Sequence, residues 1–202
     1  MRKHPVAVVL SLAALALTTA AMAPSAGADS GGGGGGGETK RVRLMDDCDP
    51  KTFNAVFPAG TCVKDGDTTV DELVAQLLQN GFVPNESADD WEFKPGDFHI
   101  DHGDRIRAVN TGGEFHTFTE VEEFGGGCVQ ELNDLLGGLT PVPECADAGV
   151  LFKETGVAAG ETLYVHAHDL APGTHYFECL IHPWMQSVVE VRSDDDDHDD
   201  HD

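Results

Sequence analysis

Between residues 39 and 193 the chain consists mostly of short runs in which apolar and polar side chains alternate, bounded by Gly, Pro, Asn and Asp. Such runs are typical of antiparallel strands with one buried face, because successive side chains of a strand point to opposite sides of the sheet. A series of this length predicts an all-β domain, either a sandwich or a barrel. The expected strands are Lys40–Met45, Trp91–Phe93, Phe98–Ile100, Arg105–Asn110, His116–Val121, Thr162–Ala167, Thr174–Cys179 and Ser187–Arg192.

Two stretches have the spacing of amphipathic helices instead. Residues 69–80 carry apolar side chains at helical intervals, Thr69 and Glu72 have the spacing of a capping box, and Gly81 follows as a terminator. Residues 129–136 show a weaker pattern that ends at Gly137. Neither stretch carries an obvious group of reactive side chains, so we expect both helices to pack on the β-domain.

The first 28 residues have the features of a secretory signal peptide. A basic start with Arg2 and Lys3 precedes an apolar stretch from Val6 to Ala23, and small residues at 26–28 form a cleavage site. We therefore expect a secreted protein, extracellular or in the cell envelope, with no membrane span in the mature chain. An uncleaved membrane anchor is the alternative interpretation.

Two segments of biased composition flank the predicted domain, residues 39–193. The leader, residues 29–38, contains a run of glycines at 31–37 and is expected to be flexible. The tail, residues 194–202, contains only Asp and His, and its self-repulsion predicts disorder. We interpret the tail as solubilising, and capture of divalent metal by its Asp and His side chains is the alternative.

The charge of the chain restricts its partners. There are 36 acidic and 12 basic side chains, which give a formal net charge of −24. A surface this acidic repels phosphate groups, which excludes the classes of protein that bind nucleic acids or anionic membranes. A macromolecular partner is therefore expected to be basic.

The cysteines are odd in number. There are five, and the pairs Cys48–Cys62 and Cys128–Cys145 are each close in sequence. Pairing within each is the most economical of several connectivities that the sequence allows. Cys179 is then left without a partner, and a free thiol in an exported protein is open to oxidation unless it has a role.

The residues around Cys179 suggest that role. His182 and Met185 follow at intervals of three, so a thiolate, an imidazole and a thioether share one short loop. These soft donors favour copper, and one further imidazole would complete a His₂Cys site with a weak axial Met. His116, which follows a Gly-Gly turn at the start of a predicted strand, is the candidate for that imidazole.

Two other interpretations of this loop stay open. Zinc is the alternative metal, although the paired Cys or His spacing of structural zinc sites is missing. A catalytic Cys–His pair is the alternative chemistry, but the sequence marks neither an oxyanion site nor an orienting third group.

At these residues the chain resembles the cupredoxins, the family of small blue copper proteins, with a ligand loop like that of plastocyanin and amicyanin. The resemblance covers about Trp91 to Arg192. It is carried by Gly173-Thr174 leading into a strand that ends at Cys179, by the pattern Cys-x₂-His-Pro-aromatic-Met from Cys179 to Met185, and upstream by Pro95, Gly103-Asp104, Ile106, Asn110, Gly112 and His116.

The resemblance implies a Greek-key β-sandwich with one type 1 copper at one end. His116, Cys179, His182 and Met185 would be the ligands. An exposed edge of the His182 ring would be the electron port, with a redox partner docking near His182 and Trp184. The chain departs from the family at Thr117, where those relatives commonly have an Asn that ties the two ligand segments together. It also departs in the long insertion between His116 and Cys179.

We therefore expect a secreted, monomeric type 1 copper protein that carries one electron at a time and is not an enzyme. An extracellular module for copper capture or delivery is the alternative function. A subunit of an oligomeric copper oxidase or nitrite reductase is a third, with a second copper at His166 and His168, which would alternate on one strand and face the same side.

Overall fold

Two four-stranded sheets face each other in the computed structural model, which describes residues 37–193. The predicted signal peptide, nearly all of the predicted leader and the predicted tail lie outside the described residues. The first sheet has the order β2 (Glu92–Lys94), β1 (Thr39–Met45), β4 (Arg105–Asn110) and β8 (Thr162–His166). The second has the order β3 (Asp97–Asp101), β10 (Gln186–Arg192), β9 (Gly173–Glu178) and β6 (Thr119–Val121).

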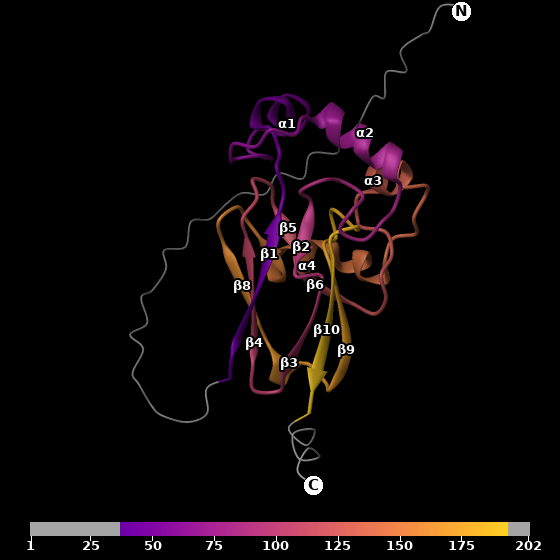
Figure 1. Ribbon diagram of the computed structural model, residues 1–202. Helices are drawn as coiled ribbons and strands as arrows, with labels where there is room; N and C mark the ends of the chain where they lie inside the picture. The colour runs from indigo at the N-terminus through magenta and orange to yellow at the C-terminus, as the bar shows by residue number, and fades with distance from the viewer. Residues whose placement is uncertain (1–36, 194–202) are drawn as a thin grey trace, which may run out of the picture. The chain divides into compact units, whose positions relative to one another are not determined.

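Each sheet contains one parallel pair of strands. β1 runs parallel to β4 and β3 runs parallel to β10, whereas the other neighbours in the two sheets are antiparallel. Parallel neighbours need a crossover connection, and here the connections that separate the paired strands are long enough to provide one. The predicted β-sandwich with helical insertions is confirmed (Figure 1).

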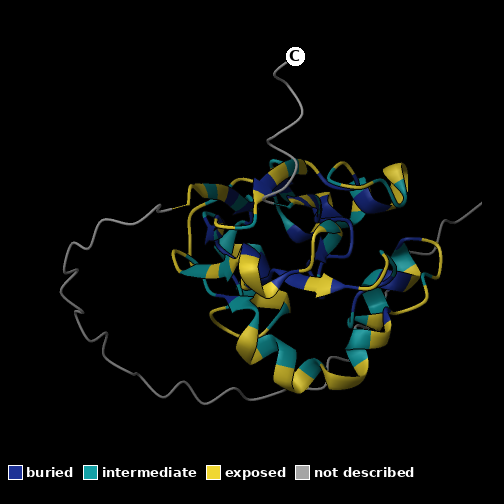
Figure 2. Ribbon diagram, turned by 90° about the horizontal axis from the view of Figure 1, so that it is seen from below, coloured by how far each residue is buried: buried dark blue, intermediate teal, exposed yellow. Residues whose placement is uncertain are grey.

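Strand alternation places the core between the sheets. The side chains that face inward are apolar and almost fully buried, and aromatic rings fill the space between the layers, with Phe118 stacked on Phe177 at 4.4 Å between ring centroids. Figure 2 shows buried residues concentrated on the strands and exposed residues on the peripheral helices. The inward-facing residues include Val42, Leu44, Ile106, Ala108, Phe177, Val189 and Val191.

The predicted strand His116–Val121 is divided in two. β5 (His116–Thr117) pairs with β7 (Gly156–Val157) in a small separate sheet, whereas β6 pairs with β9. Phe118 stands between them and its amide donates to the carbonyl of Thr155, 2.9 Å away. The chain thus leaves one sheet and enters another at Phe118, which places His116 at the end of the sandwich.

Helices occupy the connections between strands. α2 (Val70–Asn80) begins with the predicted capping box of Thr69 and Glu72 and buries Leu73 and Leu77. α3 (Gln130–Leu135) is the second predicted helix. The sequence did not predict α1 (Pro50–Val56), α4 (Ala148–Glu154) or the 3₁₀ turns η1 (Pro143–Asp147) and η2 (Ala167–Asp169). In Figure 1, α1 and α2 lie beyond the upper end of the sheets.

Two disulfides hold these connections. They join Cys48 to Cys62, around α1, and Cys128 to Cys145, around α3. These are the pairs that the sequence favoured, and Cys179 is the free cysteine. No helix among residues 37–193 is long and apolar enough to cross a membrane.

Candidate metal centre

Cys179 follows β9 directly and begins the loop that leads to β10. The loop is closed by its own backbone, because the Cys179 amide donates to the Met185 carbonyl (3.0 Å) and the Met185 amide donates to the His182 carbonyl (2.9 Å). These two hydrogen bonds bring His182 back toward Cys179. Met185 is fully buried in the same loop, as are Cys179 and Leu180.

His116 reaches the site from a separate connection, the segment between β4 and β5. Buried Asn110 shapes that segment: its side-chain amide donates to the carbonyls of Glu114 (2.7 Å) and Val157 (2.8 Å), and its oxygen accepts from the Gly112 amide (2.9 Å). The turn therefore has a fixed form, and His116 leaves it at the start of β5.

The two segments bring three donor residues together. His116 Nδ1 lies 3.9 Å and His182 Nδ1 lies 3.7 Å from Cys179 Sγ. The ligand atoms of all three residues lie within 4.8 Å of one another, the one such cluster of three in the described part of the chain. Bonds of about 2.0–2.3 Å from nitrogen and sulfur to one ion would place donors at about these separations. The donor set therefore fits a small ion that accepts thiolate and imidazole.

Thr117 joins the two ligand segments. Its hydroxyl accepts from the Leu180 amide (2.9 Å), and its own amide points at Cys179 Sγ at 3.5 Å. Thr117 thus makes the kind of link that the resemblance attributes to an Asn at this position. The hydroxyl can do so because it is fully buried beside the loop.

A carboxylate lies behind each imidazole, on the side away from Cys179. Asp46 Oδ2 is 2.8 Å from His116 Nε2, and both side chains are fully buried. Glu114 Oε2 is 3.6 Å from His182 Nε2 and accepts a hydrogen bond from Trp91 Nε1 at 2.8 Å. Sequence reasoning missed Asp46, Glu114 and Trp91, because two carboxylates do not stand out among 36 acidic residues.

These contacts change the ionisation of the site. Burial alone would lower the pKa of His116, but its hydrogen bonds with Asp46 and Cys179 raise it to about 10. Burial alone would raise the pKa of Asp46, but the hydrogen bond and charge of His116 and the amides of Gly113 and Glu114 lower it to about 2. Burial likewise opposes ionisation of Cys179, yet hydrogen bonds and charge from both imidazoles hold the pKa of this thiol well below its usual value. The cysteine is therefore ready to act as a thiolate.

The expectation of an exposed histidine edge is wrong. His182 is 4% exposed and Trp184 is fully buried, with the two rings in edge contact at 5.3 Å. Glu114, itself 7% exposed, faces the outer nitrogen of His182, and Trp91 packs behind it on Phe53 of α1. The insertion that contains α1 therefore contributes to the cover over this end of the sandwich.

The other candidate histidines lie elsewhere. β8 ends at His166 and His168 lies in the 3₁₀ turn η2, so the prediction that both lie on one strand is wrong. Their ring centroids are still 5.1 Å apart, but neither belongs to the three-residue cluster. The sequence thus located the three clustered donors, while the structure adds the residues that surround them.

Comparison with known proteins gives structural matches alone. No family model matches the chain, and no curated protein matches it. A purple cupredoxin from Nitrosopumilus maritimus is 17% identical, with a TM-score of 0.36, over 54% of this chain and 94% of the other. An amicyanin variant with Cu(I) is 15% identical, with a TM-score of 0.32, over 50% and 74%. Oxidised plastocyanin from Dryopteris crassirhizoma is 16% identical, with a TM-score of 0.32, over 55% and 96%. With its ligand-loop sequence, its two-sheet sandwich and its buried His–Cys–His cluster, the chain resembles the cupredoxins.

Proposed function

We propose that the protein is a copper-binding carrier of single electrons, with His116, Cys179 and His182 as ligands and Met185 as a weak axial ligand. The observation that carries this proposal is the buried cluster in which two imidazole nitrogens lie 3.9 and 3.7 Å from one thiol sulfur. Copper prefers this combination of soft sulfur and imidazole donors. One cluster of three donors in residues 37–193 supports one copper per chain.

Bound copper would supply a redox couple between Cu(I) and Cu(II). The surrounding residues favour electron transfer by this couple. Cys179 is held by the Met185 carbonyl, and the adjoining Leu180 amide is held by Thr117, so the donors have little freedom to move. The three donor residues are at most 4% exposed, which keeps bulk water and substrates from direct contact with them. This arrangement suits an electron carrier better than an enzyme.

We further propose that the protein works outside the cytoplasm as a monomer and exchanges electrons with a basic partner. The signal-like first 28 residues and the net charge of −24 support this setting. Because the His182 ring is buried, we expect the partner to contact the residues that cover it instead of the ring itself.

Copper loading tests the proposal. The purified protein should bind one Cu(II) per chain, become intensely coloured by charge transfer from the Cys179 thiolate, and show one reversible one-electron wave in voltammetry. Cys179→Ser should abolish the colour. A matched control that replaces the two clustered surface histidines, His166→Ala with His168→Ala, should keep both colour and stoichiometry. A colourless protein that holds a full equivalent of copper would refute the proposal.

A further inference from the structure

The two imidazoles of the cluster are arranged in the same way. Each presents Nδ1 to Cys179, and each has a buried carboxylate near Nε2. The two carboxylates are not equivalent, because Asp46 lies at 2.8 Å from His116 whereas Glu114 lies at 3.6 Å from His182. A separation of 3.6 Å is too long for a hydrogen bond, so the close contact is the one made by Asp46.

The contact with Asp46 decides which nitrogen of His116 can bind a metal. An ionised carboxylate only accepts hydrogen bonds, so the nitrogen that faces it must carry the proton. When a metal ion displaces the other proton, the neutral imidazole keeps its one N–H on Nε2, and the lone pair of Nδ1 is free on the side of Cys179. Without this partner, either nitrogen could carry the proton and the ring could turn. Carboxylate partners of this kind fix the orientation of a histidine ligand and raise its basicity.

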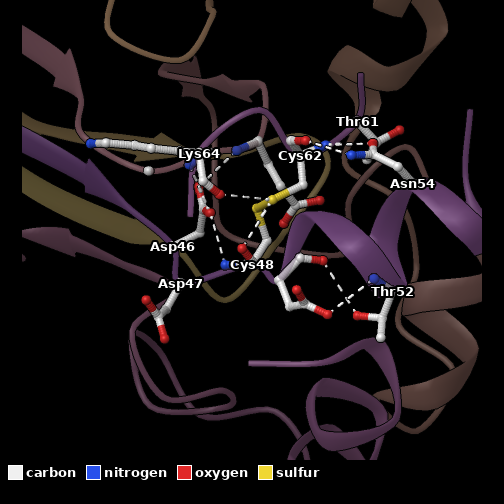
Figure 3. Close-up of a disulfide and its surroundings, with 12 residues drawn as sticks. Asp46, Asp47, Cys48, Thr52, Asn54, Thr61, Cys62 and Lys64 are labelled. Atoms are coloured by element: carbon white, nitrogen blue, oxygen red, sulfur yellow. Dashed lines mark hydrogen bonds between the residues drawn. A yellow bond between two sulfur atoms is a disulfide. The ribbon is translucent and has the colours of Figure 1, made fainter. Parts of the chain in front are cut away.

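Asp46 is itself held firmly in this position. Its Oδ1 accepts from the amides of Gly113 (2.9 Å) and Cys48 (3.3 Å), and its Oδ2 accepts from the amide of Glu114 (3.1 Å) as well as from His116. Figure 3 shows the carboxylate beside the Cys48–Cys62 disulfide. Both oxygens of Asp46 accept hydrogen bonds from N–H groups. An Asn at position 46 would therefore direct its NH₂ group, which is a donor, at one or more of these N–H donors.

Asp46 reaches the site from a distant part of the chain. It follows the end of β1, 70 positions before His116. The turn before β5 accommodates it closely, since a Cβ atom on Gly112 would overlap Oδ2 of Asp46. The carboxylate and the ligand loop are therefore fitted to each other.

We propose that Asp46 is a positioning residue for the metal centre, which fixes His116 with its proton on Nε2 so that Nδ1 is the metal-binding atom. The inference rests on the proposed function only in requiring that the cluster binds a metal, and Zn²⁺ can therefore replace copper in its test. Asp46 does not touch the ion and acts through His116.

The test compares Asp46→Asn with Asp47→Asn. Each change removes one negative charge, and the two positions are adjacent. The Asp47 carboxylate accepts from the Asp67 amide at 3.0 Å, whereas it is Asp46 that contacts His116. We expect D46N to bind Zn²⁺ and Cu(I) about 10–100-fold more weakly in competition with a chelator, the range typical of such outer partners. D47N should bind within twofold of the wild type. Equal affinities of D46N and the wild type would overturn the proposal.

A second measurement keeps the proposal testable if D46N does not fold. In ¹⁵N-labelled wild-type protein loaded with Zn²⁺, the imidazole resonances of His116 should show a protonated Nε2 and a metal-bound Nδ1. A proton on Nδ1, or metal on Nε2, would overturn the role of Asp46. A wild-type protein that binds Zn²⁺ in this way but gives no coloured Cu(II) form would refute the electron carrier and leave the positioning role intact.

Discussion

Glu178, the residue before Cys179, gives the metal-free protein a pH dependence whose size can be calculated. Its side chain is fully buried; Oε2 accepts from the Gly125 amide (3.1 Å) and the Gln186 side chain (3.3 Å), whereas Oε1 has no partner. Burial raises the pKa of Glu178 to about 8 despite the Gly125 hydrogen bond, and the charge of Cys179 adds to the rise. The ordinary value, expected in the unfolded chain, is 4.5.

Between these two pKa values the folded protein holds one more proton than the unfolded chain. The free energy of unfolding therefore falls as the pH rises, by about 1.4 kcal/mol per pH unit for one proton. Ionisation of Glu178 does not destabilise the native state below pH 4.5, and the destabilisation is complete above about pH 8. In Glu178→Gln the side chain cannot ionise, so the wild type should lose roughly 2.7 kcal/mol relative to E178Q between pH 5 and 7.

The assay is urea unfolding of the metal-free, disulfide-bonded protein at pH 5, 6 and 7, followed by tryptophan fluorescence. Glu123→Gln is the matched control, because Glu123 is exposed and the same change there should leave the pH dependence of the wild type unaltered. If the unfolding free energies of wild type and E178Q change in parallel over this range, Glu178 is not held neutral by burial and the reasoning fails.

Two further pairs of substitutions test the packing of Thr117 and of α2. Thr117→Val leaves the buried amide of Leu180 without its acceptor and should lower the unfolding free energy by about 1–3 kcal/mol. Thr117→Ser keeps the hydroxyl and should retain most of the wild-type stability. Equal stability of the two variants would contradict this role of Thr117. Leu77→Ala, at a fully buried position of α2, should cost about 2–5 kcal/mol in urea unfolding. Leu78→Ala, at a position that is 64% exposed, should stay within about 0.5 kcal/mol of the wild type, and a reversed order would show that α2 packs by another face.

Local signals explain what the sequence could predict. The strands were located because inward positions must be apolar, and α2 was located because both its apolar spacing and its capping box lie within a few residues. The ligand loop could be identified for the same reason, since Cys179 and His182 are three residues apart. Even His116 was marked by its place after a Gly-Gly turn.

The rest depends on contacts between distant segments. α1 has a single buried residue, Phe53, and therefore no apolar period to detect. The change of sheet at Phe118 is set by pairing with β7 and β9, which the alternation within residues 116–121 does not contain. The burial of His182 depends on Glu114 and Trp91, and the role of Asp46 depends on a contact across 70 positions.

The fit between the ligand turn and the first disulfide has a consequence for loop grafting. A Cβ atom on Gly113 would lie 2.7 Å from Cys48 Sγ and 3.2 Å from Cys62 Sγ, so the turn rests directly on the two sulfur atoms. The turn also supplies the amides that hold Asp46. A transplant of residues 111–116 into another sandwich would carry the histidine but neither its carboxylate nor the surface beneath it. A graft that keeps the geometry of the site therefore has to include both the turn and the segment from Asp46 to Cys62.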